Sequence, residues 1–105
     1  MGGRADPLVM APMSLQAHRD RIEAVDRLLV AAIALRLRSV AELQGLKRAA
    51  GLPLTDAPQE AAVVARARGW AAELGAPPAL VERVLRTVVE EGKRAGRPVA
   101  PAPEP

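Results

Sequence analysis

The chain has 105 residues, contains no cysteine and one histidine, and carries 15 Lys and Arg against 12 Asp and Glu. This composition excludes a disulfide framework, a thiol nucleophile and a conventional zinc site. The net charge of +3 comes without blocks of basic residues or stacking aromatics, so we expect no nucleic-acid partner. Because the chain has one His and no Cys, we also expect no metal.

Half of the residues are hydrophobic, but the aromatic share is 1% and consists of Trp70 alone. A core made of Ala, Leu, Val and Ile buries little area per side chain, so a domain of this size gains from oligomerising. Trp70 is expected to be an anchor in the core or in a dimer. The longest apolar run, Leu28 to Leu35, is far shorter than the roughly 18 residues of a membrane span. No signal peptide is recognisable, and we expect a cytoplasmic protein without membrane contact.

The two ends of the chain lack helical periodicity. Residues 1–13 contain two glycines and two prolines and are expected to form a flexible leader. Residues 97–105 contain four prolines and are expected to form a Pro-rich disordered tail. A single helical domain is expected between them, over residues 14–96.

The first expected helix runs from Ser14, a suitable N-cap, to about Arg48. Its apolar residues recur at helical spacing: Leu15, Ile22, Val25, Leu29, Ile33, Val40 and Leu43. Gly51 and Pro53 end this pattern.

Two shorter helices follow. Asp56 is suited to cap the second helix, with Gln59 three residues on as in a capping box, and the helix runs to Leu74 before Gly75. Pro77 and Pro78 open the third helix, whose apolar pairs form one stripe. Strand signals are absent, so the predicted fold is all-α with three helices.

The length of the first helix predicts a homodimer. A helix of some 34 residues is about 50 Å long, whereas a compact 105-residue domain has a radius of gyration of about 13 Å. Two short helices cannot cover such an apolar stripe. We therefore expect the long helices of two subunits to pair.

Arg36 and Lys47 are eleven residues apart, so they share one face of the long helix with Val40 and Leu43 between them. Cations within an apolar stripe need a partner or solvent, because an unpaired buried charge is costly. Both side chains could extend to solvent or pair with Asp or Glu elsewhere. Alternatively, they belong to an aliphatic pocket for a small carboxylate-bearing ligand.

Arg19 lies seventeen residues before Arg36, which is about 100° away around the helix axis. One helix therefore cannot readily aim both side chains at the same ligand. A crossed partner helix could deliver Arg19 to the site of the other subunit.

Over roughly Leu15–Ala95 the sequence resembles the small all-helical chorismate mutases of the shikimate pathway. The resemblance rests on the order and spacing of four motifs: LQAHRDRIEAVD from Leu15, Arg36 with Lys47 and GLPLTD after it, Glu60, and LVERVL with VVEE from Leu80. It implies an intertwined homodimer with two equivalent sites, an isomerase that rearranges chorismate to prephenate, and no cofactor. The reaction requires neither a nucleophile nor proton transfer, which suits a chain that has few such groups.

The resemblance also implies roles for individual residues. Arg36 and the partner subunit's Arg19 would clamp the two substrate carboxylates. Lys47 would face the ether oxygen, while the Asp56 backbone and Glu60 would hold the ring hydroxyl. From the residues alone, Asp56 could serve only as an N-cap and Glu60 only as an acid favouring the helix dipole.

Three positions differ from the family pattern. Gln59, the remaining expected substrate-binding residue, stands where an Arg is usual, Gly92 where a Ser is frequent, and Gly96 where a Gln or Glu contacts the ether oxygen. The glycines could simply mark the fraying end of the third helix. Alternatively, nearby cations substitute for the missing groups: Lys93, Arg94 or Arg97.

The departures leave other functions open. One is a mutase or pyruvate lyase acting on isochorismate or 4-amino-4-deoxychorismate. Another is a non-catalytic regulatory subunit that partners a shikimate-pathway enzyme. The sequence-derived pI of about 10.5 also motivates a helical dimer that binds nucleic acid, which strongly salt-dependent DNA binding would reveal.

Overall fold

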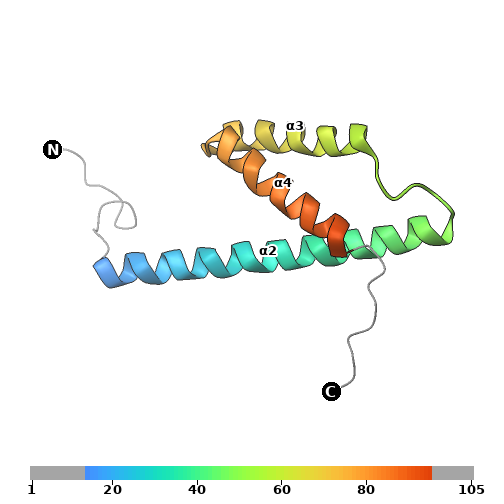
Figure 1. The fold of residues 1–105 in the computed structure, drawn as a ribbon. Coiled ribbons are helices and arrows are strands. Elements are labelled where there is room, and N and C mark those ends of the chain that lie inside the picture. The colour runs from blue at the N-terminus through green and yellow to red at the C-terminus, as the bar shows by residue number, and fades with distance from the viewer. Residues whose placement is uncertain (1–13, 96–105) are drawn as a thin grey trace, which may run out of the picture. The chain divides into compact units, whose positions relative to one another are not determined.

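The computed structural model describes residues 14–95. These form three helices, α2 (Leu15–Ala49), α3 (Ala57–Leu74) and α4 (Pro78–Ala95), and no strand occurs among them (Figure 1). The all-α prediction with three helices is confirmed. The leader, the Pro-rich tail, Gly96 and Arg97 lie outside the described residues. The chain divides into two compact units, Met1–Ala32 and Ile33–Pro105.

Helix α2 begins and ends with local hydrogen bonds that its sequence favours. The Ser14 hydroxyl accepts a hydrogen bond from the Ala17 amide at 3.0 Å, which confirms the predicted cap. At the other end Gly51 has φ 70°, and the Leu52 amide donates to the Lys47 carbonyl at 2.8 Å. This is a Schellman ending, which turns the chain out of the helix at a residue without a Cβ.

Helix α3 has the predicted caps at both ends. The Asp56 carboxylate accepts a hydrogen bond from the Gln59 amide at 3.1 Å. Gly75, with φ 77°, follows the last turn, and its amide donates to the Ala71 carbonyl. The chain then reverses direction and enters α4 at Pro78.

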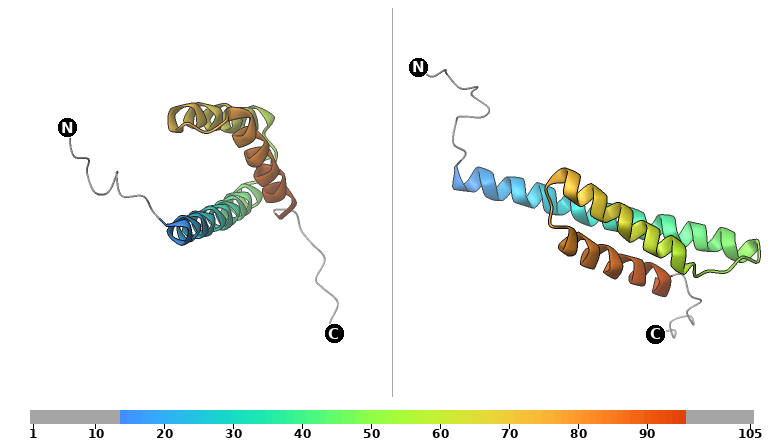
Figure 2. Two further views of the ribbon diagram at one scale, coloured as in Figure 1. Left: turned by 90° about the vertical axis from the view of Figure 1, so that its left-hand side faces the viewer. Right: turned by 90° about the horizontal axis from the view of Figure 1, so that it is seen from above.

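In the unit from Ile33 onwards, helix α3 packs against α4 (Figure 2). The buried apolar residues are Val64, Ala67 and Ala71, which recur at helical spacing along α3. No side chain among residues 14–95 is completely buried. The expected thin aliphatic core is therefore confirmed for the single chain.

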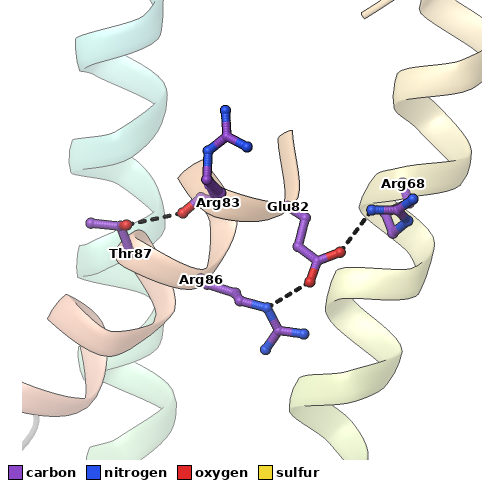
Figure 3. Close-up of polar contacts among 5 residues, drawn as sticks. All are labelled: Arg68, Glu82, Arg83, Arg86 and Thr87. Carbon is purple, nitrogen blue, oxygen red and sulfur yellow. Dashed lines mark hydrogen bonds and ion pairs between the residues drawn. The ribbon is translucent and has the colours of Figure 1, made fainter. Parts of the chain in front are cut away.

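An ion-pair cluster also joins α3 to α4 (Figure 3). The Glu82 carboxylate of α4 accepts from Arg68 of α3 and from Arg86, each at 2.8 Å. The Arg86 and Arg68 guanidinium groups lower the pKa of Glu82 below its ordinary value of 4.5. The cluster links the two helices near the N-terminal end of α4, and its side chains remain partly exposed to solvent.

The unit that precedes Ile33 consists, as far as it is described, of the first half of α2. Between residues 14 and 32 no residue is buried, and only Ala17 is partly covered. Leu15 is 68% exposed and Leu28 70%, values typical of an uncovered helix. None of the described helices is long and apolar enough to cross a membrane.

The Trp70 indole is 55% exposed, with the Arg66 guanidinium 5.9 Å from its ring centroid. Its prediction as a core anchor is wrong for the single chain, because α3 turns Ala67 and Ala71 inwards instead. A role in a dimer stays a prediction.

Candidate active site

A pocket of about 150 Å³ lies within the unit from Ile33 onwards and is partly open to solvent. Its wall comes from the second half of α2, from the segment before α3, and from the first turns of α3 and the last turns of α4. Five of the six predicted substrate-binding residues line it: Arg36, Lys47, Asp56, Gln59 and Glu60. Aliphatic side chains fill the space between these polar groups: Val40, Leu43, Leu54, Val63 and Val89.

The two predicted cations lie on the same wall of the pocket. Arg36 and Lys47 are both partly buried, and neither side chain has a hydrogen bond or an ion pair to any residue between 14 and 95. The alternative that they pair with Asp or Glu elsewhere in the chain is therefore wrong for the described part. Two partly desolvated cations without a counter-charge, next to aliphatic groups, suit a small anionic ligand.

Asp56 caps helix α3 and also lies in the lining of the pocket. Its carboxylate oxygen Oδ1 accepts a hydrogen bond from the backbone amide of Gln59 in the first turn of α3. Gln59 is exposed at the pocket and brings no charge.

Glu60 is more than a favourable acid in the first turn of α3. Its carboxylate forms an ion pair with Lys93 of α4 at 2.9 Å, and both residues line the pocket. Lys93 also contacts Glu90 at 3.2 Å. Glu60 and then Glu90 raise the pKa of Lys93 above its ordinary value of 10.5, so its ammonium group stays charged at neutral pH.

Gly92 does not mark the fraying end of α4, because the helix continues to Ala95 and Gly92 is buried. A Cβ atom at this position would lie 3.3 Å from Cγ1 of Val40 and 3.9 Å from Cδ2 of Leu37. The glycine allows α4 to approach α2 closely, and even a serine would force Val40 to shift. The absence of a side chain at position 92 thus lets α4 pack closely against Val40 of α2.

Gln44 belongs to the pocket and was not predicted. Its side chain is 8% exposed, and Nε2 donates a hydrogen bond to the Leu54 carbonyl at 3.3 Å. The amide oxygen of Gln44 is buried and has no hydrogen-bond partner among the described residues. The signal in the sequence is its register, four residues after Val40 and three before Lys47.

Arg19, the sixth predicted residue, lies on α2 in the unit Met1–Ala32, where it is exposed. Its role as a residue donated to a partner subunit stays a prediction. Among residues 14–95, no group of three His, Asp or Glu side chains could hold a metal ion.

Comparison with known proteins gives a family. The family model described as chorismate mutase type II matches residues 18–96. The T-protein of Enterobacter agglomerans is 44% identical over 77 residues, which are 73% of this chain and 21% of that protein. The chain thus spans about a fifth of the length of this curated relative. No solved structure matches the chain significantly. On the family match, which extends over most of the three helices, the chain belongs to the chorismate mutase type II family.

Proposed function

We propose that the chain catalyses the rearrangement of chorismate to prephenate. The observation that carries the proposal is the pocket in which Arg36 and Lys47 lie partly buried and form no ion pair with any residue between 14 and 95, while Glu60 lines the same pocket. Chorismate is a small dicarboxylate, so it supplies the negative charge that these two cations lack. Family membership supports the same activity.

The rearrangement breaks the C–O bond of an ether and forms a C–C bond within one molecule. The enzyme has to hold the reactive conformer and to stabilise the charge that develops on the ether oxygen. In the proposed site Arg36 binds one carboxylate through two parallel N–H bonds, and the ammonium group of Lys47 faces the ether oxygen. The backbone of Asp56 and the Glu60 carboxylate hold the ring hydroxyl.

The second carboxylate is assigned to the partner subunit's Arg19 in a homodimer with sites shared between subunits. Two observations support this assignment. The pocket is partly open within the single chain, and the first half of α2 exposes apolar side chains such as Ile22 and Leu29. A second copy of this half-helix would cover both.

A related substrate is the alternative that the pocket itself favours. Gln59 brings no charge, and Gly92 brings no side chain, so two groups of the family pattern are absent from this site. Both related substrates carry the same pair of carboxylates. Isochorismate has the hydroxyl and the ether at other ring positions, and 4-amino-4-deoxychorismate has an amino group in place of the hydroxyl. The cytoplasmic location and a regulatory association with another shikimate-pathway enzyme stay predictions.

The test follows the consumption of chorismate, isochorismate and 4-amino-4-deoxychorismate by the purified full chain. We expect turnover of at least one, with chorismate preferred, and a loss of about 10²–10³ in rate for Lys47→Ala. Arg38→Ala is the matched control, because Arg38 is exposed on the same helix and does not line the pocket. Absence of turnover for all three substrates, at concentrations where light scattering shows a dimer, would contradict the proposal.

A further inference from the structure

We propose that Lys93 is a further ligand-binding residue of this pocket, whose ammonium group donates a hydrogen bond to the anionic substrate while Glu60 holds it in place. The inference rests on the proposed function, because it adds a residue to the same site.

The structure distinguishes between the cations near the end of α4. Lys93 lines the pocket, and its side chain is only 24% exposed. The neighbouring Arg94 is 69% exposed, pairs with Glu91 at 2.6 Å and does not line the pocket. Of the two cations on the described end of α4, Lys93 is therefore the one that a ligand in the pocket would meet.

Two contacts place Lys93 at this position. The preceding residue, Gly92, lies against Val40, so α4 meets α2 beside the pocket wall. From the other side, Glu60 of α3 reaches the Lys93 ammonium group at 2.9 Å. A long flexible side chain thus has a defined location before any ligand binds.

The hydrogen-bonding capacity of the ammonium group leaves room for a ligand. A lysine ammonium has three N–H donors. Glu60 and Glu90 account for two of them, at 2.9 and 3.2 Å. The third donor is available to an oxygen atom of a molecule bound in the pocket.

The charge balance of the pocket supports the same role. The lining residues include three cations, Arg36, Lys47 and Lys93, and two carboxylates, Asp56 and Glu60. Without Lys93, the Glu60 carboxylate would face a doubly negative ligand with no counter-charge. Lys93 therefore makes this side of the pocket compatible with an anion.

The positions of lysine in the sequence also support a ligand-binding role for Lys93. Lysine occurs only at positions 47 and 93, whereas the other 13 basic residues are arginines. Both lysines line the same pocket, the candidate active site. A compact ammonium group is strongly hydrated and makes point contacts, in contrast to the planar fork of arginine.

The first experiment compares Lys93→Met with Arg94→Met in the full chain. For the substrate that the unmodified chain consumes, we expect kcat/KM to fall roughly tenfold to a hundredfold in Lys93→Met, as for loss of a hydrogen bond from a charged group. Arg94→Met should stay within about twofold, because its side chain is outside the pocket. Lys93→Arg, which keeps the charge, should recover part of the loss.

The second experiment separates ligand contact from a purely structural ion pair. With lysine labelled by ¹³C at Cε, the chain gives only two side-chain NMR signals, and Lys93→Met assigns them. Addition of chorismate should shift both signals at the same ligand concentration. An unchanged Lys93 signal while that of Lys47 shifts, or unchanged kcat/KM in Lys93→Met, would overturn the inference and leave the proposed function intact. If neither signal shifts and no substrate is consumed, the proposed function itself fails.

Discussion

The two halves of helix α2 share one apolar spacing but have different surroundings. Up to Ala32 the stripe residues, among them Ile22 and Leu29, are more than half exposed. From Ile33 onwards the stripe lines the pocket with Val40 and Lys47, and Gly92 of α4 lies against it. The spacing of apolar residues therefore indicates which face of the helix is apolar. Whether that face is buried depends on which other helix packs against it.

The first half of α2 also differs from the α3–α4 pair in the size of its apolar side chains. The packing of α3 on α4 uses small side chains such as Ala67 and Ala71, which allow close approach. The first half of α2 instead carries large ones, including Leu15 and Val25. Burying such a side chain contributes about 1.5–3 kcal/mol, so a partner that covers several of them gains considerable stability.

The strongest test of the contrast combines one variant from each region. Arg36→Met removes a cation of the pocket, and Arg19→Met removes a cation of the first half of α2. If two subunits share each site, both variants should lose about a hundredfold in rate. Equal amounts unfolded and refolded together should then regain about a quarter of the unmodified activity, because half of the dimers carry one intact site out of two.

The control is the same refolding procedure applied to each variant alone, which should give no recovery. Absence of recovery in the mixture, with mixed dimers demonstrated by mass, would contradict a shared site. Full activity of Arg19→Met would contradict the role of the first half of α2 altogether.

The next test changes the exposed stripe itself. Ile22→Glu places a charge on the apolar face, and burial of an unpaired charge in a dimer would be costly. We expect a monomer by light scattering at micromolar concentration and loss of activity. Ala31→Glu introduces the same side chain on the opposite face of the helix and should remain dimeric. Equal masses for both variants would show that this face is not an interface.

A smaller effect is expected where α4 meets α2. Gly92→Leu inserts a side chain where a Cβ already lies 3.3 Å from Val40, and such overpacking costs about 1–3 kcal/mol of unfolding free energy. Gly69→Leu is the comparison, since nothing lies within 4 Å of a Cβ there and leucine favours a helix. Urea unfolding curves measure both. A Gly92→Leu chain as stable as the unmodified one would mean that the helices do not pack closely at this point.

The smallest effect concerns the ion-pair cluster of Glu82. Because its pKa is lowered in the folded chain, the cluster stabilises the fold at pH values above the ordinary 4.5 and ceases to do so as the pH falls through the lowered value. Glu82→Gln should therefore lower the melting temperature slightly at pH 7 and weaken the loss of stability on acidification. Glu73→Gln, at a position with no ion pair among the described residues, serves as the control. Identical pH profiles for Glu82→Gln and the unmodified chain would contradict a stabilising role.

Much of the fold was predictable because its signals are local. Ser14, Asp56 and Gly75 act within one turn of their own helix ends, so the helix boundaries were correct to within about one residue. Arg36 and Lys47 were placed on one face by the helix period alone. The surroundings of Trp70 were not predictable, because they depend on which face of α3 the other helix covers.

In the pocket, too, features that depend on local spacing were predictable, and contacts between distant residues were not. Five of its residues were found through motif spacing, whereas Gln44 and the ion pair between Glu60 and Lys93 were not. Gln44 interacts with Leu54, ten residues further on, and Lys93 with Glu60 of another helix. The restriction of lysine to two positions was visible in the sequence, but its meaning depended on the pocket.

By itself, the small, cysteine-free sequence with one aromatic residue determined three helices, the caps of the first two, an apolar stripe on the longest, and two cations within that stripe. These features follow from backbone hydrogen bonds and helical periodicity, which act between neighbours in the chain. Only the tertiary structure decided that Gly92 provides close packing and that Lys93 lines the pocket. Such contacts join residues of different helices, and the distance between helices is fixed by side-chain packing rather than by sequence spacing.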